Sequence, residues 1–111
     1  MILYGISNCD TVRKARKFLE NQQVDFQFHD FRKDGLDVAT IQNWLKTIDF
    51  SELLNKRSTT WKNLSESDRQ AIENQDLALL AQNPTLIKRP VLVTENTLLV
   101  GFNAERYQEV L

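Results

Sequence analysis

Residues 7–17 read SNCDTVRKARK and mark the point where a short apolar segment gives way to a basic helical pattern. Cys9, the only cysteine of the chain, stands at this junction. The first N–H groups of a helix have no partner inside the helix, and the helix dipole is positive at that end. Both effects favour the thiolate of a cysteine placed there, and the thiolate is the nucleophilic form. Cys9 is therefore the first candidate for chemistry.

A lone cysteine can also be a small packed hydrophobic residue. Two features of the sequence favour the chemical interpretation of Cys9. It follows the polar pair at 7–8, and the Asp-Thr pair at 10–11 keeps its surroundings polar. Arg13 and Arg16, about one and two helical turns further on, are expected to add positive charge near the sulfur.

Composition and charge describe an ordinary single-domain chain. Its 111 residues are 41% hydrophobic and 26% charged, and 14 basic against 15 acidic residues leave a formal net charge of −1. A chain of this size can bury a core without metal or disulfide support. The balanced charge predicts neither nucleic acid nor a membrane as a partner. One cysteine cannot form an internal disulfide, and no stretch resembles a membrane span or a leader, so we expect a cytoplasmic protein.

The segments around the junction predict a β-α-β unit. Residues 2–6, ILYGI, form a short apolar run that is typical of a buried strand. Apolar residues recur at helical spacing over 10–22, and residues 24–30 alternate between apolar and polar positions. A short crossover of this kind joins parallel strands with right-handed connectivity. Asp30 and Asp34 flank the turn that follows and suggest no catalytic role.

The middle of the chain predicts an all-helical subdomain. Asp37 is placed to cap a helix whose apolar positions run through 38–48. Between residues 50 and 83 the pattern changes to short helical segments with their own capping residues, and no strand is expected there. No Gly/Ser-rich linker sets this region apart. We therefore expect one domain, 1–111, with a helical insertion at about 36–84.

The C-terminal part predicts a β-hairpin followed by a helix. Residues 91–94 and 97–101 are rich in β-branched and aliphatic side chains, and residues 95–96 supply the turn between them. Asn103 is placed to cap a final helix. The predicted order is β-α-β, helices, β-β-α, and the fold class is α/β.

This order, with Cys9 at the first strand-to-helix junction and Pro90 just before the third strand, resembles the thioredoxin fold. Three motifs make the chain similar to the arsenate reductase-like (ArsC/Spx) family, and most similar to its YffB-type subgroup. They are YGISNCDTVRKA at 4–15, LLNKRSTTW at 53–61 and LIKRPV at 86–91. The resemblance covers the whole chain.

The resemblance implies roles for three residues. Cys9 matches the family's redox cysteine, which in arsenate reductases attacks the oxyanion and then forms a mixed disulfide with glutathione or glutaredoxin. Arg89 matches an arginine that helps to hold an anion near that cysteine. Pro90 matches the cis-proline that thioredoxin-like folds place opposite the cysteine. Arg89 could also be a solvated surface charge, but its place beside a proline at the start of a strand favours a functional role.

Departures from the family pattern argue against efficient arsenate reduction. Where the reductases carry two further arginines, this chain has Asn55 and the pair at 101–102, and the nearest candidate to the first is Arg57. Arsenate bears up to two negative charges, and a pocket that lacks cationic partners binds it poorly. Spx-type regulators often use a Cys-x-x-Cys switch, whose second position is Val12 here, so no local disulfide switch is possible.

The resulting hypothesis is a monothiol oxidoreductase that uses glutathione. Cys9 attacks a small-molecule or protein disulfide, and an external thiol from glutathione or glutaredoxin resolves the mixed disulfide. No bound cofactor and no metal are expected, since His29 is the only histidine. The residues expected to contact substrate or glutathione are Asn8, Thr11, Arg13, Arg57, Arg89 and Pro90, with Lys88 as a further cation. Asn8 and Thr11 could equally serve only as helix caps.

A second hypothesis follows from the resemblance to Spx-type regulators. The chain would then be a non-enzymatic binding module that contacts an RNA polymerase subunit. The basic helix face that carries Arg13, Lys14, Arg16 and Lys17 could dock an acidic partner, although such a face also serves simply to solubilise a protein.

Overall fold

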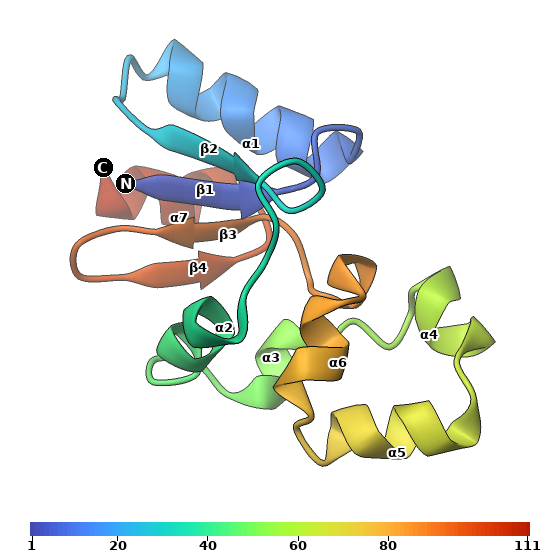
Figure 1. Cartoon of the computed structure of the whole chain (residues 1–111). Helices are drawn as coiled ribbons and strands as arrows, with labels where there is room; N and C mark the ends of the chain where they lie inside the picture. The colour runs from blue at the N-terminus through green and yellow to red at the C-terminus, as the bar shows by residue number, and fades with distance from the viewer. The chain divides into compact units, whose positions relative to one another are not determined.

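The computed structural model describes residues 1–111, which form two compact units (Figure 1). The first unit consists of residues 1–35 and 89–111 and contains the sheet. The second consists of residues 36–88 and is helical. The predicted helical insertion, about 36–84, falls within the second unit, and the grouping of both units into one domain stays a prediction.

A four-stranded sheet organises the first unit, with strand order β2-β1-β3-β4. Its elements are β1 (Ile2–Gly5), α1 (Asp10–Asn21), β2 (Gln27–Asp30), β3 (Val91–Val93), β4 (Leu98–Val100) and α7 (Ala104–Val110). Strand β1 is parallel to β2 and antiparallel to β3, and β3 is antiparallel to β4. The predicted α/β class and the thioredoxin-like order, β-α-β followed by β-β-α, are confirmed.

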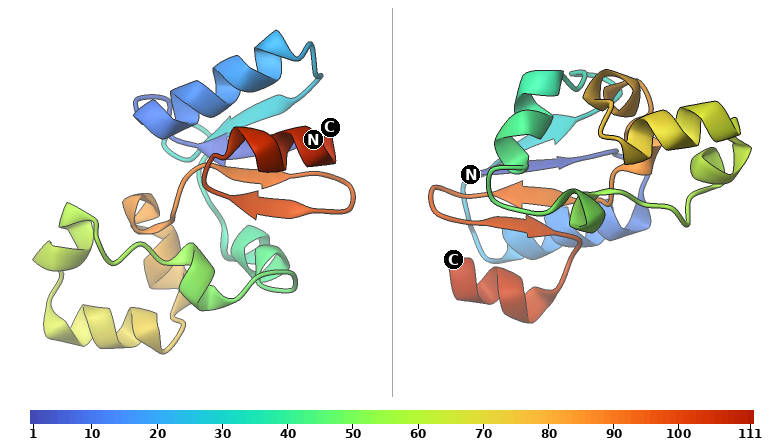
Figure 2. Two further views of the ribbon diagram at one scale, coloured as in Figure 1. Left: turned by 180° about the vertical axis from the view of Figure 1, so that it is seen from behind. Right: turned by 90° about the horizontal axis from the view of Figure 1, so that it is seen from below.

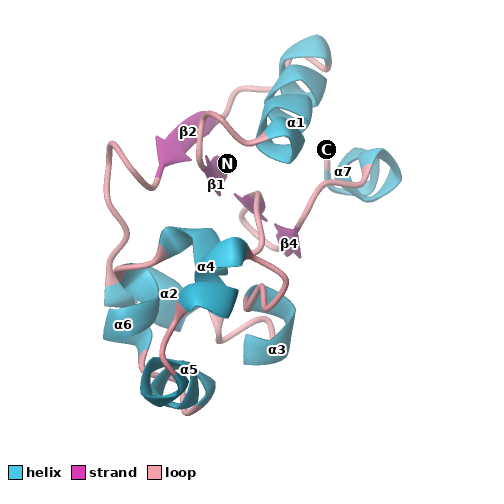
Figure 3. Ribbon diagram, turned by 90° about the vertical axis from the view of Figure 1, so that its right-hand side faces the viewer, coloured by secondary structure: helices cyan, strands magenta, loops and turns pink.

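Helices α1 and α7 cover the same face of this sheet (Figures 2 and 3). The buried cluster between them and the strands consists of Leu3, Ala15, Leu19, Leu92, Leu99 and Tyr107. The Tyr107 ring meets Phe102 edge-on, and its hydroxyl donates a hydrogen bond of 3.1 Å to the Gly101 carbonyl. Because the phenol is buried, its pKa is raised well above the usual range. Tyr107 therefore has a structural role in the core and not a catalytic one.

The end of β1 and the first turn of α1 approach each other closely at Gly5. A Cβ atom added at Gly5 would lie 2.7 Å from Cγ2 of Val12, which is closer than such atoms approach in proteins. The chain then turns between Ile6 and Cys9, and the Cys9 N–H donates to the Ile6 carbonyl at 3.1 Å. Glycine at position 5 therefore lets the helix that follows Cys9 begin directly against the strand.

The second unit is built from short helices: α2 (Val38–Trp44), α3 (Phe50–Leu53), α4 (Thr59–Asn63), α5 (Glu66–Glu73), α6 (Leu77–Ala81) and the 3₁₀ turn η1 (Pro84–Leu86). The Asp37 carboxylate caps α2 by accepting from the Thr40 N–H at 2.8 Å, as predicted. Trp44 and Trp61 are buried within this unit. An isolated β-bridge between Leu54 and Ile87, which the sequence did not predict, joins the end of α3 to the segment after η1.

Strand β2 begins later than the sequence pattern indicated. The alternation starts at Val24, whereas the strand starts at Gln27. The Val24 N–H is engaged by the Leu19 carbonyl at 3.2 Å, and Gln23 has a φ of 56°. This arrangement belongs to the end of helix α1 and satisfies one of its last carbonyls. Val24 is therefore used to end the helix, although its side chain follows the strand pattern.

Candidate active site

Cys9 lies at the N-cap of α1, where the chain leaves the turn after β1. Its φ and ψ of −89° and 126° are extended, and its carbonyl accepts the first helical hydrogen bond, from the Arg13 N–H at 2.9 Å. The side chain is partly buried and free of any disulfide. This is the predicted position at the start of the helix. It leaves the sulfur beside backbone N–H groups that have no acceptor inside the helix.

The surroundings of Cys9 favour its thiolate. Burial raises the pKa of the thiol, but the backbone N–H groups of Val12 and Thr11 and the guanidinium of Arg89, all of which favour the thiolate, together outweigh burial. The net effect is a Cys9 pKa below its ordinary value. A thiol of lowered pKa that keeps some exposure is the kind of group that attacks disulfides and other electrophilic sulfur.

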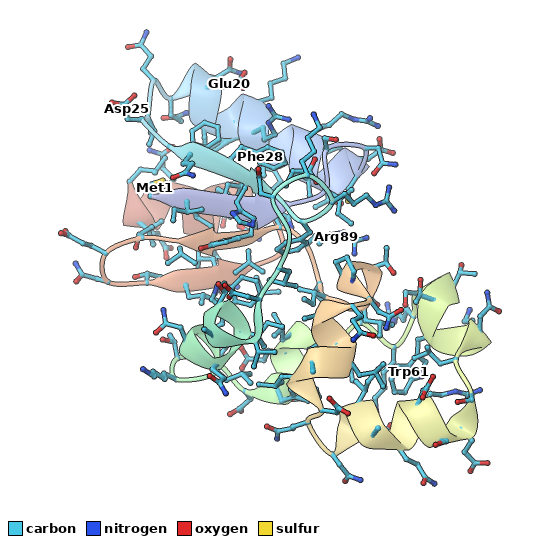
Figure 4. All side chains as sticks on the ribbon, viewed as in Figure 1. Met1, Glu20, Asp25, Phe28, Trp61 and Arg89 are labelled. Atoms are coloured by element: carbon cyan, nitrogen blue, oxygen red, sulfur yellow. The ribbon has the colours of Figure 1, made fainter.

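Arg89 is the side chain that acts on the sulfur from the opposite part of the unit. It is half-buried and lies two residues before the start of β3, where Figure 4 labels it. The peptide bond between Arg89 and Pro90 is cis, in the place where the family resemblance put a cis-proline. Pro90 is buried, and its carbonyl accepts from the Gly101 N–H at 2.8 Å, which ties this turn to the strand pair β3–β4.

The two arginines of α1 have partners other than the sulfur. The Arg13 guanidinium forms an exposed ion pair with Asp10, one turn back on the same helix. The guanidinium carbon of Arg16 lies 4.1 Å from the centroid of the Phe28 ring, on strand β2. The positive charge that lowers the Cys9 pKa is therefore that of Arg89, and not the helix charge that the sequence suggested.

The remaining predicted site residues are placed as follows. Asn8 and Thr11 are exposed on either side of Cys9, and Thr11 acts on the thiol through its backbone N–H. Arg57 lies in the helical unit, exposed, with its N–H bonded to Oδ1 of Asn55 at 3.1 Å. Lys88 closes that unit, and its N–H donates to the Leu53 carbonyl at 2.8 Å. The structure thus brings together Cys9, Arg89 and the first amides of α1.

Asp30 is a part of this region that the sequence interpretation missed. Its side chain is only 4% exposed, and its carboxylate accepts from the Ser7 N–H at 3.4 Å and from the Arg32 N–H at 2.8 Å. Burial raises its pKa, but these hydrogen bonds outweigh burial and hold the pKa below the usual range. A signal was present, because Asp30 continues the inward-facing series of Phe26 and Phe28 along the second strand. A carboxylate at an inward-facing position needs hydrogen-bond donors inside the protein.

No group of three or more His, Cys, Asp or Glu side chains is arranged to hold a metal ion. The Nε2 atom of His29 lies 2.7 Å from the Gly35 carbonyl, and its ring packs 4.9 Å from the ring of Tyr4. None of the helices has the length and apolar composition that crossing a membrane requires.

A thioredoxin-like α/β sheet with a cysteine at the start of its first helix defines a class of thiol-based proteins. Within that class, the ArsC family model matches residues 4–110, and the chain belongs to this family. An uncharacterized protein of Haemophilus influenzae is 44% identical over 107 residues, 96% of this chain and 94% of that protein. The regulatory protein MgsR of Bacillus subtilis is 32% identical over 106 residues, 93% of this chain and 83% of MgsR.

A solved structure of a YffB protein superposes on the chain with a TM-score of 0.90 at 35% sequence identity, covering 97% of this chain and 96% of that one. The predicted membership of the ArsC/Spx family is therefore confirmed. The similar proteins include an arsenate reductase-related protein of Brucella melitensis, 40% identical with a TM-score of 0.73, as well as the regulator MgsR. Membership of the family therefore does not decide between an enzyme and a regulator.

Proposed function

We propose that the protein is a glutathione-linked thiol–disulfide reductase that uses Cys9 as its single nucleophile. In the first step the Cys9 thiolate attacks the glutathione sulfur of a glutathionylated substrate. The substrate S–S bond breaks, a Cys9–glutathione disulfide forms, and the substrate leaves as a thiolate. In the second step a glutathione thiolate attacks the glutathione sulfur of that disulfide and releases the Cys9 thiolate. One substrate disulfide is reduced and one oxidised glutathione is formed, so electrons balance.

The observation that carries this proposal is the position of Cys9 between the first amides of α1 and Arg89. The same donors that stabilise the thiolate also make Cys9 a good leaving group in the second step, because a thiol of lower pKa leaves faster. The chain has no second cysteine, so the resolving thiol must come from outside. Glutathione or a glutaredoxin can supply it, which suits a reducing cytoplasmic environment.

Glutathione carries two carboxylates, and the proposal assigns cations to them. Arg89 is beside the sulfur, and Arg13 is exposed on the same unit. Arg57 belongs to the helical unit, where it is exposed, and its contact with glutathione stays a prediction of the sequence. Asn8, Thr11 and Pro90 are proposed to line the path of the tripeptide backbone. Arginine suits carboxylates because its guanidinium can form two parallel hydrogen bonds with them.

Mass spectrometry after incubation with oxidised glutathione tests the first step. We expect one glutathione adduct on the native protein, located on Cys9, and none on Cys9→Ser. Added reduced glutathione should remove the adduct. Steady-state reduction of a small disulfide such as hydroxyethyl disulfide should require both reduced glutathione and Cys9. A folded protein whose thiol forms no adduct would exclude this mechanism.

Arsenate is an alternative substrate for the same cysteine. The hairpin end where arsenate reductases carry an arginine has Gly101 and Phe102, and Phe102 packs against Phe18 and Tyr107. This aromatic position offers no charge to a dianion. Comparison of arsenate and hydroxyethyl disulfide in the same glutathione-coupled assay separates the two activities, and the proposal requires the disulfide to be the better substrate.

A regulatory role is a second candidate, because MgsR is a relative with 32% identity. On this alternative the exposed cations of α1 dock an acidic surface of a partner such as an RNA polymerase subunit. Capture of purified polymerase by the native protein and by Cys9→Ser distinguishes the candidates. Binding that survives in Cys9→Ser, together with absent disulfide turnover, would favour the regulator.

A further inference from the structure

Asp30 is the one charged side chain that the fold buries, at 4% exposure. It ends strand β2, opposite Gly5 in the parallel pair β1–β2. Burial of an ionised carboxylate is unfavourable unless hydrogen bonds compensate for the lost hydration. The sequence offers no such compensation within the strand, and the partners of Asp30 lie on two neighbouring turns.

The two carboxylate oxygens of Asp30 hold different segments. Oδ2 accepts from the Ser7 N–H at 3.4 Å, in the turn that leads from β1 to Cys9. Oδ1 accepts from the Arg32 N–H at 2.8 Å, in the turn that follows β2. The Ser7 side chain also contributes to holding the pKa of Asp30 below its usual range. One side chain therefore connects the turn before Cys9 to the end of the neighbouring strand.

We infer that Asp30 is a positioning residue for Cys9, because its carboxylate fixes the Ser7–Asn8 turn and thereby the start of α1. This inference rests on the proposed thiolate chemistry. The groups that stabilise the thiolate directly are the Val12 N–H, Arg89 and the Thr11 N–H. Asp30 acts through the turn, since the sulfur meets those donors only while the turn from Ile6 to Cys9 keeps its geometry.

The substitution Asp30→Asn is informative because a carboxamide has only one accepting oxygen. In the structure both oxygens accept backbone N–H groups, so the amide nitrogen of the substituted side chain would face a donor. One of the two turns must then give up its hydrogen bond. Asp34→Asn is the matched control. It removes the same charge from the same turn, but the exposed Asp34 uses only Oδ2, on the Asp30 N–H at 3.0 Å.

The experiment is the pH profile of iodoacetamide alkylation of Cys9 in the native protein, Asp30→Asn and Asp34→Asn. We expect the native protein and Asp34→Asn to share one profile. In Asp30→Asn the midpoint should move to higher pH, and alkylation at neutral pH should be about two- to tenfold slower. This is the change in rate that corresponds to the net free energy of one lost hydrogen bond. Ser7→Ala, which removes the hydroxyl but keeps the Ser7 N–H on Asp30, should move the midpoint in the same direction by less.

The outcomes separate this inference from the proposed function. If Asp30→Asn matches Asp34→Asn, Asp30 does not position Cys9, and the thiolate chemistry stands without it. If Asp30→Asn fails to fold, Ser7→Ala decides, and a native profile for that variant overturns the inference. A native midpoint as high as that of the urea-unfolded protein instead contradicts the proposed function itself.

Discussion

At the scale of single residues, Arg89 is the side chain on which ionisation of Cys9 most depends. Its guanidinium contributes both a hydrogen bond and a positive charge to the thiolate. Replacement by glutamine removes the charge, so Arg89→Gln should raise the pKa of Cys9 and slow its alkylation at neutral pH. Measurement of alkylation rate against pH detects the change.

The control for this prediction is Arg106→Gln, which makes the same change at an exposed position of α7. It should leave the profile of Cys9 as in the native protein. Arg89→Lys keeps the charge without the planar fork and should fall between the native protein and Arg89→Gln. If the pH profiles of Cys9 alkylation are equal in Arg89→Gln and Arg106→Gln, Arg89 does not stabilise the thiolate.

Gly5 affects both core packing and the geometry of the site, because it lies against Val12 in the helix that begins after Cys9. A methyl group there would lie 2.7 Å and 2.9 Å from the two Cγ atoms of Val12. Since the cost of overpacking is typically 1–3 kcal/mol, Gly5→Ala should lower the free energy of unfolding by roughly that amount in urea titrations. The first turn of α1 must shift to make room for the methyl group.

Val12→Ala removes both clashing atoms, so the double variant Gly5→Ala/Val12→Ala should lose less stability than the sum of the two single variants. Gly35→Ala is a useful contrast, because a Cβ there meets nothing within 4 Å and only its φ of +78° opposes the change. Strict additivity of the Gly5 and Val12 substitutions would show that this contact does not limit the approach of helix and strand.

At the scale of elements, the cap of α7 is a local prediction of the sequence that the structure confirms. Oδ1 of Asn103 accepts from the Arg106 N–H at 3.1 Å. Removal of such a cap typically costs about 1 kcal/mol, so Asn103→Ala should lower the free energy of unfolding by about that amount. Asn103→Ser keeps an accepting oxygen and should retain most of the stability. Chemical denaturation of both variants makes the comparison, and equal losses would mean that capping is not the cause.

Elements were predictable where one residue type fixes the local geometry. Asp37 and Asn103 were recognisable as caps because their short side chains reach the N–H three residues on. Helix α4 was not predicted, although Ser58 caps it by accepting from the Trp61 N–H. Its five residues contain too few apolar positions to show a helical period. The start of β2 was misplaced because backbone hydrogen bonding, and not side-chain pattern, decides where α1 ends.

The site was predictable only in part, for a related reason. The position of Cys9 followed from one local pattern at the strand-to-helix junction. The partner Arg89 is 80 positions away in the sequence, and only the family resemblance pointed to it. Asp30 was missed because its role depends on the register that sets it opposite Gly5, which a sequence pattern does not contain. Long-range partners of a reactive group therefore required the structure.

At the scale of the whole molecule, ionisation of Cys9 is linked to global stability. The pKa of Cys9 is lower in the folded protein than its ordinary value, so the unfolded chain binds more protons at pH values between the two. The free energy of unfolding of the native protein, relative to that of Cys9→Ser, should therefore rise as pH increases through this window. Below the folded pKa the difference should be constant. Urea titrations of both proteins across the pH range test the sign.

The most direct test of the central claim is the pKa of the single thiol itself, measured by pH-dependent alkylation in the folded protein and in urea. Because Cys9 is the only cysteine, every modified thiol reports on this position. The account predicts a folded-state pKa below that of the urea-unfolded chain. A folded-state pKa equal to or above the unfolded one would contradict it, since the amides of α1 and Arg89 would then fail to stabilise the thiolate.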